Sequence, residues 1–478
     1  MTAPIAALLL PLVVAPSLVQ AQEEAAPLSF VKSQASLATN VDLIELGALN
    51  NENVPGISNV SKSCNNDGTG KRSPLVPCID LSGAGSALTI FNGSYYGLFD
   101  NGPAESCADL AESGYATAQG KQGEGFFLPT MSPTIVKLSG GISSGFEIDV
   151  HGSIVLRNSM GEKISARPPP ELNVTVYGPG CAQIFGADPE GVDPEDVHHV
   201  PGTNWMVLVE EYLPSILVVN MMNGQVLARY VPEGVTLDGA NYPVIQALPS
   251  VYFDPGRGFE SLAVDPANGE WLVTVLQSNL DNESRVHRAI EMRINKSDPT
   301  NFSLTKQFVI PGSPVEAYPD ELEQADLKMS AGWALSSNRT MILLERATNQ
   351  VKLFSVDLNS AEDINTMPRF ANSLLLEQLS VNQSLPVEAA TRFLIWDSKR
   401  TIGGSSIDSK KLEGVVPVIN EFFYGTTLLL VNDNDFGAGG SMPTQFTEIE
   451  LGASAFIPSF VVSETDALLK QSSAASFS

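Results

Sequence analysis

The stretch GRGFESLAVDPANGEWLVTVLQ, residues Gly256 to Gln277, has the pattern of two strands joined by a tight turn. Apolar residues alternate with period two on either side of Asp265–Gly269, where Pro, Asn and Gly are concentrated. This alternation is typical of β-strands, and this composition is typical of a hairpin connection. Glu260 stands near the start of the first strand, and Gln277 follows the second. The stretch therefore predicts a β-hairpin with polar side chains at its open end.

The same order of opening residue, strand, turn and strand recurs along the chain. The opening positions are residues 195, 260, 330 and 413, which lie 65, 70 and 83 residues apart. A weaker copy at residues 85–102 closes with Asp100 and Asn101. A hairpin repeated at this period indicates a radial array of blades. Because six blades of about 65 residues would use roughly 390 residues, we expect an all-β protein that folds as a six-bladed β-propeller.

Four of these segments also resemble a known family. They are VDPEDV to ARYVPEG, GRGFESLAV to LQS, ILLERATNQVKLFSVDL and LEGVV to NDNDFG, and they occur in this order within residues 80–452. They are similar to the phytase-like domain family, also called esterase-like activity of phytase. The resemblance implies a β-propeller with an acidic central site. We expect a signal peptide at 1–21, an N-terminal extension and loop at 22–79, the phytase-like propeller domain at 80–460 and a C-terminal tail at 461–478.

The charge of the chain restricts its partners. Its 478 residues include 27 Lys and Arg against 54 Asp and Glu, which gives a formal net charge of −27. Nucleic acids and anionic membranes are bound by basic patches, so we expect neither as a partner. No apolar run after the first 21 residues is long enough to span a bilayer, so we expect no membrane anchor. A polyanionic substrate would be repelled unless metal ions intervene.

The N-terminal residues predict export. Met1–Ala21 has no charged side chain, contains the apolar run Ile5–Val14 and ends in Val-Gln-Ala, as secretory signal peptides do. We therefore expect a secreted, extracellular protein. Eight Asn-x-Ser/Thr sequons predict a glycoprotein if the host is eukaryotic; they begin at Asn59, Asn92, Asn173, Asn282, Asn295, Asn301, Asn338 and Asn382.

The four cysteines predict disulfides. Cys64, Cys78, Cys107 and Cys181 are even in number, which in an oxidising compartment suggests two bonds. Three pairings are possible, and we favour Cys64–Cys78 with Cys107–Cys181. Buried free thiols are the alternative. A zinc site is not expected because the sequence has no Cys-x-x-Cys pair or Cys/His cluster.

The repeats also predict a functional site. In a propeller, the first residues of the innermost strands face the central channel, so repeats in register bring Glu195, Glu260 and Glu413 together. We expect these three carboxylates to be catalytic. Gathered carboxylates repel one another and favour a cation, and oxygen ligands suit calcium. The expected metal ligands close the repeats: Glu211, Glu345, Asp433, Asn434 and Asp435. Capping of turns by Asp and Asn is the structural alternative.

Two arginines are the best-placed cations for a phosphate group. A guanidinium matches phosphate geometry, so we expect Arg257 and Arg346, together with Gln277, to bind the substrate. Surface or stacking roles are the alternative for both arginines. His198 and His199 flank the first repeat and are expected to be solvent-facing turn residues if they have no function.

Three functional hypotheses follow. The first is a secreted hydrolase of phosphoric esters, in which calcium polarises the phosphate and a carboxylate activates water. The second is a non-catalytic extracellular propeller that binds a glycan or protein at its rim. The third is a calcium-dependent hydrolase of carboxylic esters or lactones. We favour the first, with a small phosphoester as the substrate.

Overall fold

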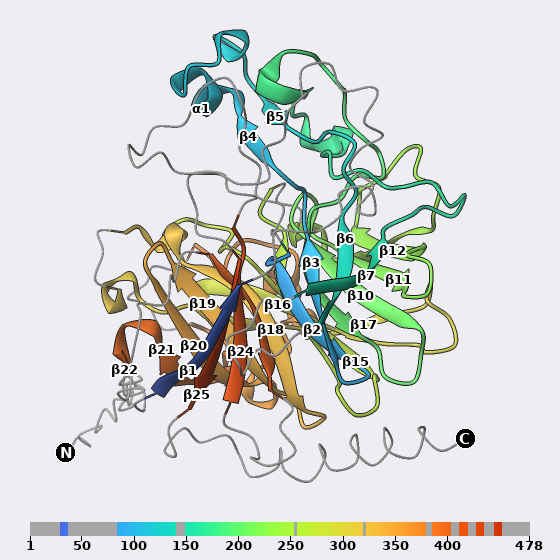
Figure 1. Cartoon of the computed structure of the whole chain (residues 1–478). Coiled ribbons are helices and arrows are strands. Elements are labelled where there is room, and N and C mark those ends of the chain that lie inside the picture. Colours follow the sequence, from blue (N-terminus) through green and yellow to red (C-terminus); the bar gives the residue numbers. More distant parts are fainter. Residues whose placement is uncertain are drawn as a thin grey trace, which may run out of the picture.

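The computed structural model describes residues 29–36, 84–139, 149–252, 256–318, 322–378, 385–402, 411–418, 427–434 and 444–451. Several expected features lie outside these residues: the signal peptide, Cys64 and Cys78, the sequons at Asn59 and Asn382, Asp435 and the C-terminal tail. The described part of the chain consists mainly of β-strands (Figure 1).

Most strands belong to five largely antiparallel sheets. The first contains β2 (Ala87–Phe91), β3 (Ser94–Phe99), β6 (Thr134–Ser139) and β7 (Asp149–Val155). The second contains β9 (Pro194–His199), β10 (Trp205–Glu210), β11 (Ser215–Asn220), β12 (Val226–Pro232) and β13 (Val244–Leu248). The third contains β14 (Phe259–Val264), β15 (Trp271–Leu276), β16 (Val286–Arg293) and β17 (Ser303–Pro311).

The remaining two sheets complete the set. The fourth contains β18 (Lys328–Ser336), β19 (Thr340–Ala347), β20 (Gln350–Asp357) and β21 (Thr391–Asp397). The fifth contains β23 (Leu412–Pro417), β24 (Thr427–Asn432), β25 (Gln445–Glu450), β1 (Ser29–Ser36) and β22 (Thr401–Ile402).

Helices in the described residues are short. The two α-helices are α1 (Cys107–Glu112) and α2 (Pro368–Ala371). Single 3-10 turns lie at η1 (Ala116–Ala118), η3 (Pro170–Leu172), η4 (Pro179–Cys181), η5 (Ser250–Tyr252), η6 (Val315–Ala317), η7 (Gln324–Asp326), η8 (Leu358–Ser360), η9 (Ile364–Thr366) and η10 (Ser398–Arg400). No helix among these residues has the length and apolar character to span a membrane.

The five sheets form a closed ring. Their innermost strands are β2, β9, β14, β18 and β23; each contacts the next, and β23 contacts β2. Sheets arranged in this way are the blades of a propeller, so the predicted fold class is confirmed. The described strands form five blades, whereas the repeat period predicts six. The count differs because residues 100–133 and 156–193, which the chain length assigns to blades, lie largely outside the blades and contain a separate small sheet.

The core lies between neighbouring blades. On β10, Met206 and Leu208 pack toward the first blade, whereas Val207 and Val209 pack toward the third. Corresponding apolar clusters join the third blade to the fourth, the fourth to the fifth and the fifth to the first. Since successive side chains of a strand point to opposite faces and both faces of a blade are buried, strands inside the blades such as β10 and β15 are apolar at almost every position.

The quoted hairpin forms as predicted. Strands β14 and β15 pair in antiparallel register, with Val264 opposite Leu272. The carboxylate of Asp265 accepts hydrogen bonds from the backbone N–H groups of Ala267 and Glu270, which fixes the turn.

A buried carboxylate joins three innermost strands. Asp196 of β9 accepts hydrogen bonds from the backbone N–H groups of Leu262 in β14, at 2.8 Å, and Gly332 in β18, at 3.2 Å. The neighbouring His198 is 4% exposed and lies 2.9 Å from the carbonyl oxygen of Gly332 and 3.2 Å from the hydroxyl of Thr89 in β2. The expectation that His198 faces solvent is therefore wrong.

The fifth blade joins both ends of the described chain. Strand β1 pairs in antiparallel register with β25, from Phe30 opposite Glu450 to Ser36 opposite Gln445. Figure 1 shows this blue strand beside the red strands of the C-terminal half. The strand lies within residues 22–79, which we assigned to an extension before the propeller.

A small cap lies over one end of the ring (Figure 1). It contains α1 and a sheet of β4 (Ala104–Ser106), β5 (Glu124–Phe126) and β8 (Val176–Tyr177). The disulfide Cys107–Cys181 links α1 to η4 across a separation of 74 residues. This half of the predicted disulfide pairing is confirmed.

Candidate functional site

A cavity of about 280 Å³ lies between the cap and the ring. Residues at the starts of four innermost strands line it from the ring, and residues of the cap segment line it from the other side. The complete lining is Asp100, Asn101, Gly102, Ala104, Glu105, Ser106, Glu124, Asp193, Glu195, Glu211, Glu260, Gln277, Lys328, Arg346, Lys411 and Glu413. Eight of these described residues carry carboxylates and three carry cationic groups, so the cavity is strongly acidic.

The three expected catalytic carboxylates all line this cavity. Glu195, Glu260 and Glu413 are each the second residue of an innermost strand, in β9, β14 and β23. They converge because these strands begin at the same end of the ring. Their exposed fractions are 5%, 2% and 2%, so each is buried in the fold while facing the cavity.

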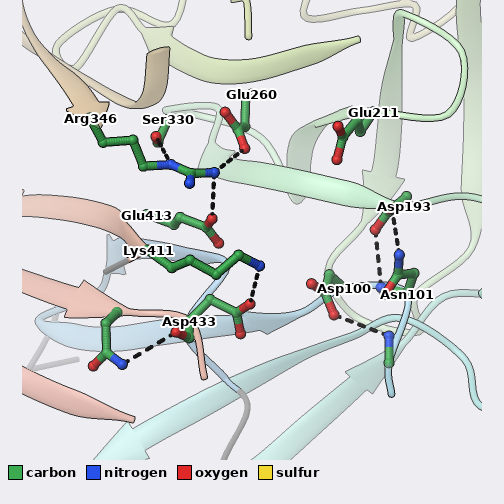
Figure 2. A network of polar contacts seen from close by, with 12 residues as sticks. Asp100, Asn101, Asp193, Glu211, Glu260, Ser330, Arg346, Lys411, Glu413 and Asp433 are labelled. Carbon is green, nitrogen blue, oxygen red and sulfur yellow. Dashed lines mark hydrogen bonds and ion pairs between the residues drawn. The ribbon is translucent and has the colours of Figure 1, made fainter. Parts of the chain in front are cut away.

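Arg346 neutralises two of them. Its Nη2 group lies 3.0 Å from Oε1 of Glu260 and 2.8 Å from Oε1 of Glu413, and its Nε donates a hydrogen bond to the hydroxyl of Ser330 (Figure 2). Burial alone would lower the pKa of Arg346, but the carboxylates of Glu260 and Glu413 raise it above its ordinary value. Arg346 therefore joins blades three, four and five through two ion pairs and a hydrogen bond.

Gln277 joins two further carboxylates. Its amide nitrogen donates to Oε1 of Glu211 at 2.8 Å and to Oε1 of Glu260 at 2.9 Å. Its amide oxygen accepts from Nη1 of Arg257, whose side chain is exposed and does not line the cavity. Both described donors to Glu260 therefore reach Oε1, and Oε2 is buried without a hydrogen-bond partner.

The backbones are close where Glu211 and Glu260 meet. Gly258 precedes β14, and a Cβ atom at this position would lie 2.4 Å from the backbone oxygen of Glu210. Any side chain at position 258 would therefore push the start of β14 away from the end of β10.

A purely acidic group lies on the other side of the cavity. One carboxylate oxygen from each of Asp100, Asp193 and Glu195 lies within 4.8 Å of the other two. Asn101 donates to both oxygens of Asp193, from its backbone N–H at 3.1 Å and its amide at 2.7 Å (Figure 2). Burial, followed by repulsion from Asp100, raises the pKa of Asp193 well above its usual range. Burial and the neighbouring carboxylates do the same to the pKa of Glu195.

The sequence of this chain matches one known protein family. The family model described as phytase-like, esterase-like activity of phytase, matches residues 81–436. The chain belongs to this phytase-like family. No curated protein matches it significantly.

Several solved structures share limited similarity with this phytase-like chain. Hydrazine synthase of Kuenenia stuttgartiensis is 10% identical, with 78% of this chain and 96% of that chain covered and a TM-score of 0.29. The periplasmic gluconolactonase of Pseudomonas aeruginosa is 11% identical, with 80% and 89% covered and a TM-score of 0.28. A putative 6-phosphogluconolactonase of Bacteroides uniformis is 11% identical, with 73% and 64% covered and a TM-score of 0.26. The propeller assignment rests on the strand topology and not on these likenesses.

The expected metal ligands of the phytase-like chain are dispersed. Glu211 lines the cavity, and Asp433 lies beside it, where its Oδ2 pairs with Nζ of Lys411 at 3.2 Å (Figure 2). Asn434 is buried but does not line the cavity. Asp435 lies outside the described residues.

Glu345 does not line the cavity, contrary to the expectation that it is a metal ligand. Its Oε2 pairs with Nη1 of Arg392 at 2.7 Å and accepts the backbone N–H of Ser313, and its Oε1 accepts the hydroxyl of Tyr318. Although burial opposes ionisation, Arg392 and Ser313 lower the pKa of Glu345 to about 2. This carboxylate is fully bonded within its own blade and its neighbour.

The sequence interpretation did not identify six charged residues of the cavity. Asp100 was recognisable because it closes the weak first hairpin, at the position that Gln277 has in the third blade. Asp193 and Lys328 each lie two residues before an opening position. In an extended chain, their side chains therefore point to the same side as that of the opening residue. Glu105 and Glu124 belong to the cap, whose contact with the ring no repeat pattern encodes, and Lys411 precedes β23.

Lys328 differs from the other two cations of the cavity. Its side chain is half-buried, and among the described residues no hydrogen bond or ion pair to its ammonium group is formed, whereas Arg346 and Lys411 both pair with carboxylates. Burial lowers the pKa of Lys328, and the charge of Glu260 opposes this effect. The arrangement can thus bind a cation at the acidic group and an anion at Lys328.

Proposed function

We propose that this phytase-like protein is a secreted, calcium-dependent hydrolase of small phosphoric esters. The observation that carries the proposal is the presence, within one cavity, of an ammonium group without a partner carboxylate, that of Lys328, and a cluster of three buried carboxylates, those of Asp100, Asp193 and Glu195. A phosphate ester on a cation needs both features, because it is an anion that must enter a negatively charged protein.

The carboxylate group fits calcium by its chemistry. Its ligands are hard oxygen atoms from strand ends and the residues beside them, and Glu195 accepts no hydrogen bond among the described residues. When bound, calcium would polarise the phosphate and offset its charge. Lys328 would hold a second phosphate oxygen, a role that we assigned to Arg346 and Arg257 from the sequence; both arginines are engaged by protein groups instead.

Glu260 is the best-placed general base of the three expected catalytic residues. Its Oε1 is held by Arg346 and Gln277, while its buried Oε2 has no partner and can accept a proton from water. The water oxygen then forms a bond to phosphorus as the ester P–O bond breaks. The proton of the water passes to Oε2, and the leaving oxygen takes up a proton from solvent.

Secretion and glycosylation remain part of the proposal. The Cys107–Cys181 disulfide supports an oxidising compartment. The sequon residues Asn92, Asn173, Asn282, Asn301 and Asn338 are exposed, which a glycan requires.

The test is turnover of an ester panel by the purified protein, with calcium and with EDTA. Phosphate release from aryl, alkyl and inositol phosphates is compared with hydrolysis of carboxylic esters and lactones. We expect calcium-dependent phosphate release, and kcat lowered about 100-fold or more in Glu260→Gln. The control Glu283→Gln changes an exposed residue outside the cavity and should retain wild-type turnover. Turnover of carboxylic esters or lactones alone would replace the proposal with the third hypothesis, and no turnover at all would favour the binding module.

A further inference from the structure

The cavity contains two groups of carboxylates, and their surroundings differ. Both groups include Glu195; one adds Asp100 and Asp193, and the other adds Glu211 and Glu260. In the second group, Arg346 pairs with Glu260, Gln277 donates to Glu211 and Glu260, and Lys328 acts electrostatically on both. The second group is therefore largely balanced by the protein itself.

In the first group, Asp193 has no cationic partner among the described residues. The charges that act most on Asp193 are those of Asp100, Glu211 and Glu210, and its described donor, Asn101, is neutral. Like-charged carboxylates at this separation in a buried site are unfavourable unless protons or a cation neutralise them.

Glu195 supplies an independent observation. Its side chain lies at the centre of both groups with an exposed fraction of 5%, and no described residue donates a hydrogen bond to it. A buried carboxylate without donors is costly in a folded protein, and most buried polar groups have partners. An oxygen-seeking cation would satisfy it.

We propose that Asp100, Asp193 and Glu195 together bind one divalent cation of the calcium type at the junction of cap and ring. Asp100 is the first residue after β3, where the chain leaves the first blade for the cap, and the other two ligands stand at the start of the second blade. The ion therefore fastens the base of the cap to two blades. Binding of the ion does not depend on the proposed function. Only a role of the ion in turnover rests on that function.

The experiment measures calcium binding by calorimetry and thermal unfolding with calcium, magnesium or manganese added singly after EDTA treatment. For wild type we expect calcium binding and a rise in unfolding temperature, because a ligand of the native state stabilises it. Asp193→Asn and Glu195→Gln should each weaken calcium binding by more than about tenfold. Without metal, both variants should unfold at or above the wild-type temperature, because one repelled charge is gone; this also shows that they fold.

Glu211→Gln is the matched control, since it removes a charge from the second group only. It should keep calcium affinity within about threefold of wild type. The assignment is overturned if wild type binds none of the three cations, or if Glu211→Gln abolishes binding while Asp193→Asn leaves it intact. Cation binding without phosphate release would uphold the cation site and reject the proposed hydrolase. Phosphate release that EDTA leaves unchanged, in a protein that binds no cation, would reject the cation site and uphold the phosphoesterase activity.

Discussion

At the scale of single residues, the role of a charged side chain in the cavity depends on the groups that contact it. Arg346 and Lys328 are adjacent in register on β19 and β18, yet one is held by two carboxylates and the other is not. Glu260 and Glu413 come from different blades, yet both are buried and both pair with Arg346. The role of a charged residue in the cavity is therefore determined by its contacts and not by its position in the repeat.

Arg346→Met tests this partnership. Removing one member of a buried ion pair leaves the other uncompensated, so we expect a loss of about 3–5 kcal/mol in the free energy of unfolding, measured with urea. Arg257→Met alters an exposed arginine and should stay within about 0.5 kcal/mol of wild type. Equal stability of the two variants would mean that Arg346 does not hold the blades together.

Glu345→Gln tests a second buried pair through its pH dependence. The pKa of Glu345 falls from 4.5 to about 2 on folding, so its carboxylate adds stability above about pH 4.5 that is lost as pH falls through about 2. At pH 7 this contribution is on the order of 3 kcal/mol. The neighbouring His287, whose pKa burial lowers to about 4, is neutral at pH 7.

We expect wild type and Glu345→Gln to differ most in free energy of unfolding near pH 7 and to converge only as the pH falls to about 2. Urea unfolding at several pH values in EDTA measures this difference. A difference independent of pH would show that the variant acts through packing and not through charge.

At the scale of elements, the cap shares one apolar cluster with the first and fifth blades. It is formed by excursions of the chain after β3 and after β7, and the Cys107–Cys181 disulfide joins the two. The cap contributes Asp100, Glu105 and Glu124 to the cavity, so its position determines the shape of the site.

A variant with Cys107→Ser and Cys181→Ser tests the disulfide. In the chain-entropy view, losing a bond that closes this loop costs about 2–4 kcal/mol. We expect hydrogen exchange to become faster in α1, β4, β5 and β8 while blades three and four keep their protection. Loss of protection throughout the molecule would instead show that the cap and the ring unfold as one unit.

At the scale of the whole molecule, the ring depends on contacts between distant segments. Strand β1 has six residues in register with β25, and it closes the fifth blade. A blade without this strand would expose the edge of β25, and an open ring would lose the cooperative packing of its neighbours.

Two truncations test the closure. A chain that begins at residue 29 keeps β1, and a chain that begins at residue 37 lacks it. We expect the shorter chain to lose on the order of 5 kcal/mol in free energy of unfolding, at about 1 kcal/mol for each paired residue. If both chains unfold at the same denaturant concentration, β1 does not contribute to closing the ring.

Local patterns in the sequence determined the propeller class, the hairpins and the meeting of Glu195, Glu260 and Glu413. They could do so because strand alternation, turn residues and repeat position are properties of short segments, and a ring of repeats brings equivalent positions together. The pairing of Cys107 with Cys181 was predicted as one of three possibilities, and the family resemblance is confirmed by the match over residues 81–436.

The tertiary structure alone decided the cap and the partners of the charged residues. Residues 100–133 contain β5, which pairs with β8 from a separate, later excursion of the chain. Arg346 binds Glu260 and Glu413, which lie 86 and 67 residues away in sequence, and Glu345, one residue earlier, points to a different partner. Such contacts depend on the relative positions of separate blades, because the free energy of a buried charge is set by whichever groups the fold brings within a few ångströms of it.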